Sequence, residues 1–142
     1  MSQRIIKPEF EVKSYIDNLK YAVENGAVIV FAEDRLSEKT KPMEYRNKYA
    51  LADLFPDESP VDVFKRELPQ LVKEEYLGTV PDDRFPDKDL WEFGKVYDPG
   101  GDVYIKFRVE LMSIENYGND IIKVVSFHYA ETALSKEVFP YK

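Results

Sequence analysis

The sequence predicts an α+β fold in which N-terminal helices pack on a C-terminal antiparallel β-sheet. Two observations lead to this prediction. Apolar residues recur at helical spacing near the N-terminus, and three strand-like apolar runs follow one another in the last third of the chain. At 142 residues the chain is long enough to bury one hydrophobic core, so we expect a single domain over residues 1–142.

Residues 9–32 are predicted to form a helix followed by a short strand. Val12, Ile16 and Leu19 recur at spacings of three and four, and Asn25 with Gly26 is a typical helix stop. The continuous apolar run over 27–32 predicts a strand buried on both faces. The polar residues 33–46 after it predict a loop.

A helical pair is predicted over residues 59–78. Ser59 is a good N-cap and Pro60 suits the first helical position, while Pro69 divides the segment into two short helices. Residues 80–89 predict an irregular loop rich in carboxylates. Their spacing lacks the EF-hand pattern, so we expect a solvated acidic loop rather than a calcium site.

An antiparallel meander is predicted over residues 89–129, and residues 130–142 form a closing tail. The turn-forming residues 98–101 join the first two strands. The middle strand alternates, with apolar residues on one face and Tyr104, Lys106 and Arg108 on the other. Strict alternation in the third strand would place His128 on the same side as Ile122 and Val124.

Composition limits the possible partners and location. The net charge of -7 opposes non-specific nucleic-acid binding, so we predict no DNA partner. No apolar run is long enough to span a membrane, and the absence of cysteine fits a reducing compartment, so a cytoplasmic location without a membrane partner is expected. The chain has no Gly-rich phosphate loop, zinc-ligand spacing or nucleophile elbow, and we therefore expect no cofactor and no metal.

The polar side of the meander has the residue types for cleaving RNA without a metal. That reaction needs a base for the ribose 2′-hydroxyl, cations beside the phosphate and an acid for the leaving oxygen. Tyr104, Lys106, Arg108 and His128 can provide them. The same residues also fit a solvated strand face with a half-buried histidine. Trp91, in the first strand, suits either base stacking or core packing.

Residues 60–142 resemble the MqsR-like branch of bacterial type II toxin–antitoxin toxins, which belongs to the wider RelE-like group of endoribonucleases. The similarity lies in four short stretches of the sequence: Trp91 to Lys95, Tyr104 to Lys106, Ser126 to His128, and Phe139 to Lys142. The resemblance implies a RelE-like arrangement of helices and sheet, RNA or the ribosome as substrate, and a cognate antitoxin as protein partner.

The resemblance also implies site residues. The family's middle-strand tyrosine falls on Tyr104, whereas its helix lysine falls on Leu77 and the glutamine after its tryptophan falls on Glu92. We therefore expect a toxin-like, metal-independent RNA endonuclease that keeps Tyr104 and uses Lys95, Lys106, Arg108 or His128 in place of the two family residues that are absent. The expected catalytic residues are Tyr104, His128 and Arg108, and the expected substrate-binding residues are Lys95, Lys106 and Trp91.

A second hypothesis is a non-catalytic acidic protein on the same scaffold, which regulates or inhibits a basic protein partner. The position of the acidic residues separates the two hypotheses. Carboxylates crowded around the predicted site would weaken the RNA hypothesis. The acidic residues in question are Glu33, Glu38, Asp82, Asp83 and Asp87.

Overall fold

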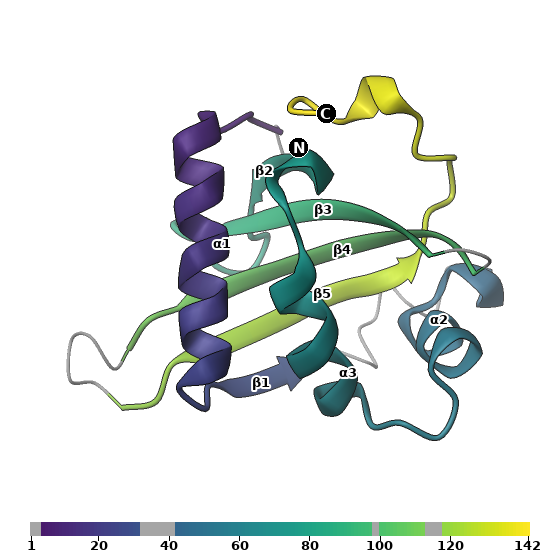
Figure 1. Ribbon diagram of the computed structural model, residues 1–142, viewed down its shortest axis with the longest axis horizontal. Coiled ribbons are helices and arrows are strands. Elements are labelled where there is room, and N and C mark those ends of the chain that lie inside the picture. The colour runs from purple at the N-terminus through teal and green to yellow at the C-terminus, as the bar shows by residue number, and fades with distance from the viewer. Residues whose placement is uncertain (1–3, 32–41, 98–99, 113–117) are drawn as a thin grey trace.

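A five-stranded mixed sheet forms the centre of the molecule, an α+β architecture in which two helices cover one face and a third packs beside the sheet (Figure 1). The computed structural model describes residues 4–31, 42–97, 100–112 and 118–142. The strand order is β1-β5-β4-β3-β2. The helices are α1 (Glu9–Glu24), α2 (Asn47–Leu54) and α3 (Pro60–Glu67). The strands are β1 (Val28–Phe31), β2 (Tyr76–Pro81), β3 (Asp89–Tyr97), β4 (Gly101–Glu110) and β5 (Ile121–Tyr129).

Helix α1 forms where the apolar spacing predicts it. Val12, Ile16, Leu19 and Ala22 are buried along one stripe. The helix ends at Asn25 and Gly26, and Gly26 takes a positive φ of 75°, which glycine adopts without steric cost. The stripe packs α1 onto the sheet, so the prediction for this segment is confirmed.

Helix α3 begins as the sequence predicts, because the Ser59 side chain accepts a hydrogen bond from the Asp62 amide and Pro60 occupies the first turn. The second helix predicted before Gly78 does not form. Short 3-10 turns at Leu68–Gln70 and Lys73–Glu75 follow, and the chain then enters strand β2. Pairing with β3 outweighs the weak helical preference of this short segment.

Strand β1 lies at the edge of the sheet and pairs with β5 in parallel. Val28 and Val30 are 46% and 47% exposed, so the expectation of burial on both faces is wrong for this strand. Of the loop predicted over 33–46, residues 33–41 lie outside the described residues. Met43–Tyr45 forms a 3-10 turn that leads into α2.

The predicted meander is confirmed, since β3, β4 and β5 pair in antiparallel order. The register of β4 and β5 shifts at one point: Lys106 faces Ser126 and Phe107 faces Val124, so Val125 forms a β-bulge. The bulge reverses the alternation of the strand. His128 therefore lies on the face opposite Ile122 and Val124, and the expectation from strict alternation is wrong.

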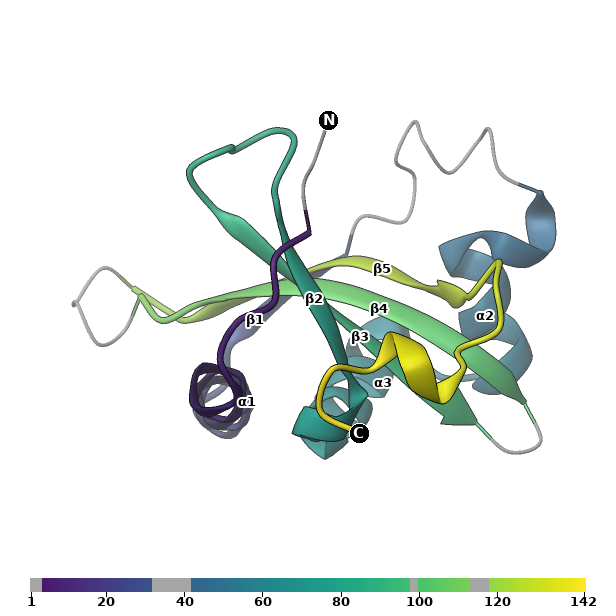
Figure 2. The same ribbon diagram turned by 90° about the horizontal axis from the view of Figure 1, so that it is seen from above.

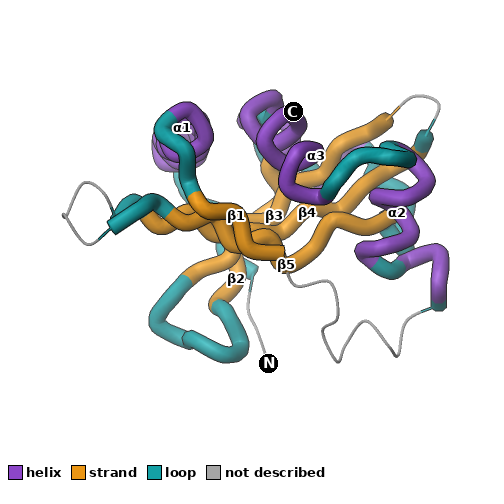
Figure 3. Tube along the Cα trace, turned by 90° about the horizontal axis from the view of Figure 1, so that it is seen from below, coloured by secondary structure: helices purple, strands orange, loops and turns teal. Residues whose placement is uncertain are grey.

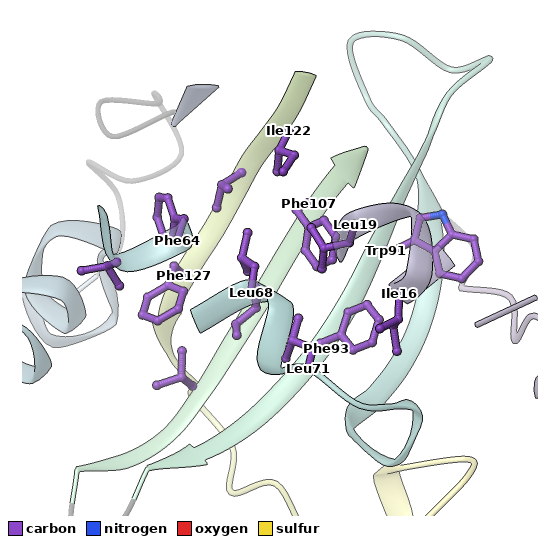
Figure 4. Packing of buried hydrophobic residues seen from close by; sticks show 14 of the residues in the cluster. Ile16, Leu19, Phe64, Leu68, Leu71, Trp91, Phe93, Phe107, Ile122 and Phe127 are labelled. Carbon is purple, nitrogen blue, oxygen red and sulfur yellow. The ribbon is translucent and has the colours of Figure 1, made fainter. Parts of the chain in front are cut away.

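The two faces of the sheet differ in character (Figures 2 and 3). On the helix-covered face, α1, α3 and the turn after α3 enclose an aromatic core that includes Phe93, Phe107 and Phe127, none of which is exposed (Figure 4). The opposite face, called here the polar face, receives the β2–β3 loop, the N-terminal segment and part of the tail. The polar face comprises Glu92, Tyr104, Lys106, Arg108, Lys123, Ser126 and His128.

Candidate active site

A hollow of about 300 Å³ lies on the polar face, where β4 begins and β5 ends. Its strand residues are Leu77, Tyr104 and His128, and the first residues of the tail, 130–134, form another wall. Arg4 closes it from the N-terminal segment. Side chains from both ends of the sequence thus meet the central strands around one space.

Tyr104 and His128 face one another across the β4–β5 pair. Their ring centroids are 5.3 Å apart and their planes are inclined by 30°. The bulge at Val125 makes this possible, because without the extra residue His128 would point into the helix-covered core. The structure thus places two of the three predicted catalytic residues side by side.

Glu92 lies beside the hollow and accepts the hydroxyl hydrogen bond of Tyr104. Arg4 donates to both oxygens of the same carboxylate, at 2.7 Å from Nε and 3.2 Å from Nη2. Glu92 is only 4% exposed, so the Arg4 guanidinium compensates a buried charge. A Cβ atom at position 78 would lie 2.5 Å from the side-chain carbons of Arg4. Glycine at this position therefore leaves room for the Arg4 side chain to reach Glu92.

The N-terminal segment brings Arg4 to this place by pairing with the edge of β2. Ile5 and Thr79 exchange two backbone hydrogen bonds, at 2.8 and 2.9 Å. The hydroxyl of Tyr141 in the tail donates to the Lys7 carbonyl and ties the same segment down. The chain therefore runs from α1 past β2 to the polar face (Figure 2).

The surroundings of the two rings indicate which atom of each carries a proton. Burial, together with the neighbouring Glu92 carboxylate, raises the pKa of Tyr104 far above its ordinary value, so the hydroxyl keeps its proton at neutral pH. The Nδ1 atom of His128 lies 3.0 Å from the Tyr129 carbonyl oxygen, which can only accept. Nδ1 therefore bears the proton, and Nε2 is the basic nitrogen of the neutral ring.

Arg108 is expected from the sequence to be catalytic, but in the structure its side chain binds two carboxylates away from the hollow. Its Nη1 donates to Asp82 at 2.6 Å and its Nε to Glu110 at 3.1 Å, with the Arg108 and Asp82 side chains only 7% and 8% exposed. The burial of Asp82 would raise its pKa, but the hydrogen bonds from Arg108 and from the Arg84 amide outweigh burial and lower it. Arg108 thus fixes the β2–β3 loop onto the sheet.

The acidic loop over 82–88 is only partly solvated. Asp82 is buried, which corrects the expectation for that residue, whereas Asp83 and Asp87 are exposed. Within the described ranges, no group of His, Asp and Glu side chains is arranged to hold a metal ion. Of the carboxylates chosen to separate the two hypotheses, Glu33 and Glu38 lie outside the described residues, and Asp82 contacts a predicted catalytic residue.

The three predicted substrate-binding residues divide between the two faces. Lys106 lies on the polar face, opposite Ser126 and next in line after Tyr104. Trp91 and Lys95 lie on the helix-covered face. The Trp91 ring stacks on Tyr15 of α1, with ring centroids 3.9 Å apart, and the Lys95 ammonium lies 3.9 Å from the Glu75 carboxylate. The sheet therefore separates these two residues from Tyr104 and His128.

Arg4, which lines the hollow, and Glu92, which lies beside it, are not among the six site residues expected from the sequence, although the resemblance places Glu92 where the family has a glutamine. Glu92 has a detectable signal: a charged residue between Trp91 and Phe93 must point away from the core those two enter, toward the side of Tyr104. Arg4 gives no comparable signal, because its position depends on edge pairing between segments far apart in the sequence.

Comparisons with protein-family models, with curated proteins and with solved structures give no match for this chain. Among the residues that the structure describes, no helix is both long enough and apolar enough to cross a membrane.

Proposed function

We propose that the protein is a metal-independent RNA endonuclease of the toxin type, with its active site in the Tyr104–His128 hollow. One observation carries the proposal: a protonated tyrosine and a histidine with a basic Nε2 face each other in a single hollow that also holds an arginine. These groups match the acid, base and cation that cleavage at a ribose 2′-hydroxyl requires.

In the proposed reaction His128 Nε2 takes the proton of the 2′-hydroxyl, and the 2′-oxygen forms a bond to phosphorus. The bond from phosphorus to the 5′-oxygen breaks, and Tyr104 gives its proton to that leaving oxygen. Arg4 and Lys106 stabilise the charge on the phosphorane, and Glu92 orients both Tyr104 and Arg4. The products are a 2′,3′-cyclic phosphate and a 5′-hydroxyl, and solvent returns the proton from histidine to tyrosine.

The test is cleavage of a single-stranded RNA by the purified protein in the presence of a chelator. His128→Ala and Tyr104→Phe are each expected to lower the rate by about 100-fold or more, as loss of an acid or base does. Tyr21→Phe, at an exposed tyrosine on α1, is the matched control and should cleave as the wild type does. Equal rates for all four proteins would refute the assigned residues, and a wild type that leaves RNA intact would refute the activity.

The resemblance to the toxin family supports further parts of the proposal, namely RNA or the ribosome as target, a cognate antitoxin as partner, and action in the cytoplasm. Expression of the protein in bacteria tests them together. Growth arrest with cleaved RNA, relieved by His128→Ala, is the expected result.

A non-catalytic interaction protein is the second candidate function, and a specific observation favours it. Two cations of the site predicted from the sequence are paired with carboxylates, Arg108 with Asp82 and Lys95 with Glu75, and so is Arg4 of the hollow, with Glu92. With a net charge of -7, such a protein would bind a basic partner, with an association rate that falls steeply as salt rises. Normal growth, intact RNA and salt-sensitive capture of a basic protein would favour this function.

A further inference from the structure

A second group of cations lies on the polar face beyond the hollow, around the exposed ring of Phe85. The ring centroid is 5.1 Å from the Lys123 ammonium, 5.7 Å from the Lys88 ammonium and 5.8 Å from the Arg108 guanidinium carbon. Phe85 is 45% exposed. An aromatic ring surrounded by cations is a combination that binds the bases and phosphates of single-stranded nucleic acid.

The ring is held in place by the loop that carries it. The Asp82 amide donates to the Lys88 carbonyl at 2.8 Å, and the Lys88 amide donates to the Phe85 carbonyl at 2.8 Å. The Asp82 carboxylate also accepts a hydrogen bond from Arg108 of strand β4. Arg108 and Lys123 are register partners on β4 and β5, so the ring lies over a cross-strand pair of cations. A stacking platform needs such rigidity, because little ordering cost remains when the base binds.

The cations lie at the ring itself, although the chain as a whole is acidic. Lys88, Arg108 and Lys123 approach the Phe85 ring. Asp82 and Glu110 pair with Arg108, and Glu110 also accepts from Lys88. Asp83 and Asp87 are exposed in the same loop, so phosphate binding would depend on the cations in contact with the ring and not on a positive charge of the whole loop.

We propose that Phe85, Lys88 and Lys123 form a subsite that binds single-stranded RNA, with a base stacked on the ring and a phosphate beside the lysines. The subsite rests on the proposed endonuclease function and extends its active site along one strand pair. Tyr104 and Arg108 are four residues apart on β4, about 13 Å at the rise of a strand, with Lys106 between them. A strand of a few nucleotides covers this distance, and a base can reach the ring only when it is outside a duplex stack.

Binding is measured with a fluorescent single-stranded oligonucleotide whose 2′-hydroxyls are all methylated. Such an oligonucleotide cannot be cleaved through the 2′-oxygen, so binding is read independently of catalysis. Phe85→Ala is expected to weaken binding about tenfold, as loss of one stacking contact does. Lys123→Gln should reduce the slope of log affinity against log salt by about 0.7, the value for one phosphate contact on a single strand.

Matched controls come from α1, on the other side of the sheet. Phe10→Ala removes a more exposed ring, and Lys20→Gln removes an exposed lysine; both should bind as the wild type does. Phe85→Leu separates stacking from apolar contact and is expected to behave like Phe85→Ala. The same sequence annealed into a duplex should bind more weakly than the single strand.

Two results would overturn the subsite: a wild type that does not bind the methylated strand, or a Phe85→Ala variant that binds it with wild-type affinity. The separate cleavage assay decides the proposed function. Binding that depends on Phe85, together with unmodified RNA left intact, would support the subsite and refute the catalytic assignment. If the wild type cleaves RNA but Phe85→Ala binds the methylated strand as the wild type does, the catalytic assignment is supported and the subsite is refuted.

Discussion

The two faces of this sheet come from the same strands but are stabilised in different ways. On the helix-covered face, Phe93, Phe107 and Phe127 are fully buried and belong to one apolar core with residues of α1 and α3. On the polar face, buried side chains such as Glu92 and Arg108 are stabilised by ion pairs and hydrogen bonds. One face therefore depends on apolar area, and the other depends on the pairing of specific atoms.

This difference predicts how each face tolerates change. Apolar packing is non-directional, so its cost scales with the volume removed. A buried ion pair depends on both partners, and removing one leaves the other charged without compensation.

The largest effect is expected on the helix-covered face. Phe93→Ala should lower the free energy of unfolding by about 3–5 kcal/mol, because a fully buried ring leaves a cavity among neighbouring aromatic side chains. Val96→Ala, three residues along the same strand at a 55% exposed position, is the control and should change stability by less than about 0.5 kcal/mol. Urea denaturation measures both. Similar losses of unfolding free energy for the two variants would show that the core does not depend on the Phe93 ring.

On the polar face, Arg108→Ala should cost about 3 kcal/mol, since Asp82 stays buried without its partner. Lys13→Ala removes a lysine of α1 that forms an exposed ion pair with Glu9, and its cost should stay below about 1 kcal/mol. Chemical denaturation compares the two variants directly. If Arg108→Ala is as mild as Lys13→Ala, the polar face does not depend on paired charges.

A smaller effect is expected where the tail packs on the polar face. A Cβ at Gly94 would lie 2.7 Å from Leu134 and 3.2 Å from Phe139, so Gly94→Ala should cost about 1–3 kcal/mol and loosen the tail. Limited proteolysis near residue 134 reports the loosening. The double variant Gly94→Ala with Leu134→Ala tests the cause. A double variant that costs the full sum of the two single changes would show that this contact is not responsible.

The smallest effect is expected from acid. Burial acts to raise the pKa of Asp82 and of Glu110, but the hydrogen bond from Arg108 to Asp82, and those from Lys88 and Arg108 to Glu110, help to lower both values. Each carboxylate therefore contributes stability that is present above its unfolded value of about 4. This contribution is lost as pH falls through the lowered folded value. Unfolding measured from pH 6 to pH 2 should show a steeper decline for the wild type than for Arg108→Met. The loss stays below that of Arg108→Ala because a protonated carboxyl keeps part of its hydrogen bonding.

The contrast between the faces also explains which features the sequence could predict. The spacing of Val12, Ile16 and Leu19 defines α1, Ser59 and Pro60 mark the start of α3, and the alternation of β4 identifies its apolar face. These signals are local and repeat along the chain. The α+β fold and the meander follow from them.

The remaining features depend on contacts between distant segments. Strand β2 forms in place of a helix because its edge pairs with β3, and β1 joins the sheet beside β5 across almost a hundred residues of sequence. Within the site, Tyr104 and His128 could be named from residue type. The pairing of Arg4 with Glu92 and the burial of Arg108 by Asp82 could not, because side-chain partners on loops and chain ends have no periodic signal.

Asn47 of α2 helps to fix the end of β5 that carries His128. Strand β1 ends opposite Val124, and the next part of the β5 edge is completed by the Asn47 amide, which donates to the Val125 carbonyl and accepts from the Phe127 amide, both at 3.1 Å. The Asn47 side chain thus forms hydrogen bonds that a neighbouring strand would otherwise form, at the bulge where the alternation of β5 reverses. The position of His128 therefore depends on α2 as well as on the strands. Deletion of residue 125 would restore strict alternation in β5 and turn His128 toward the helix-covered core, and Asn47→Ala, which removes both hydrogen bonds, should displace the strand end that carries the histidine.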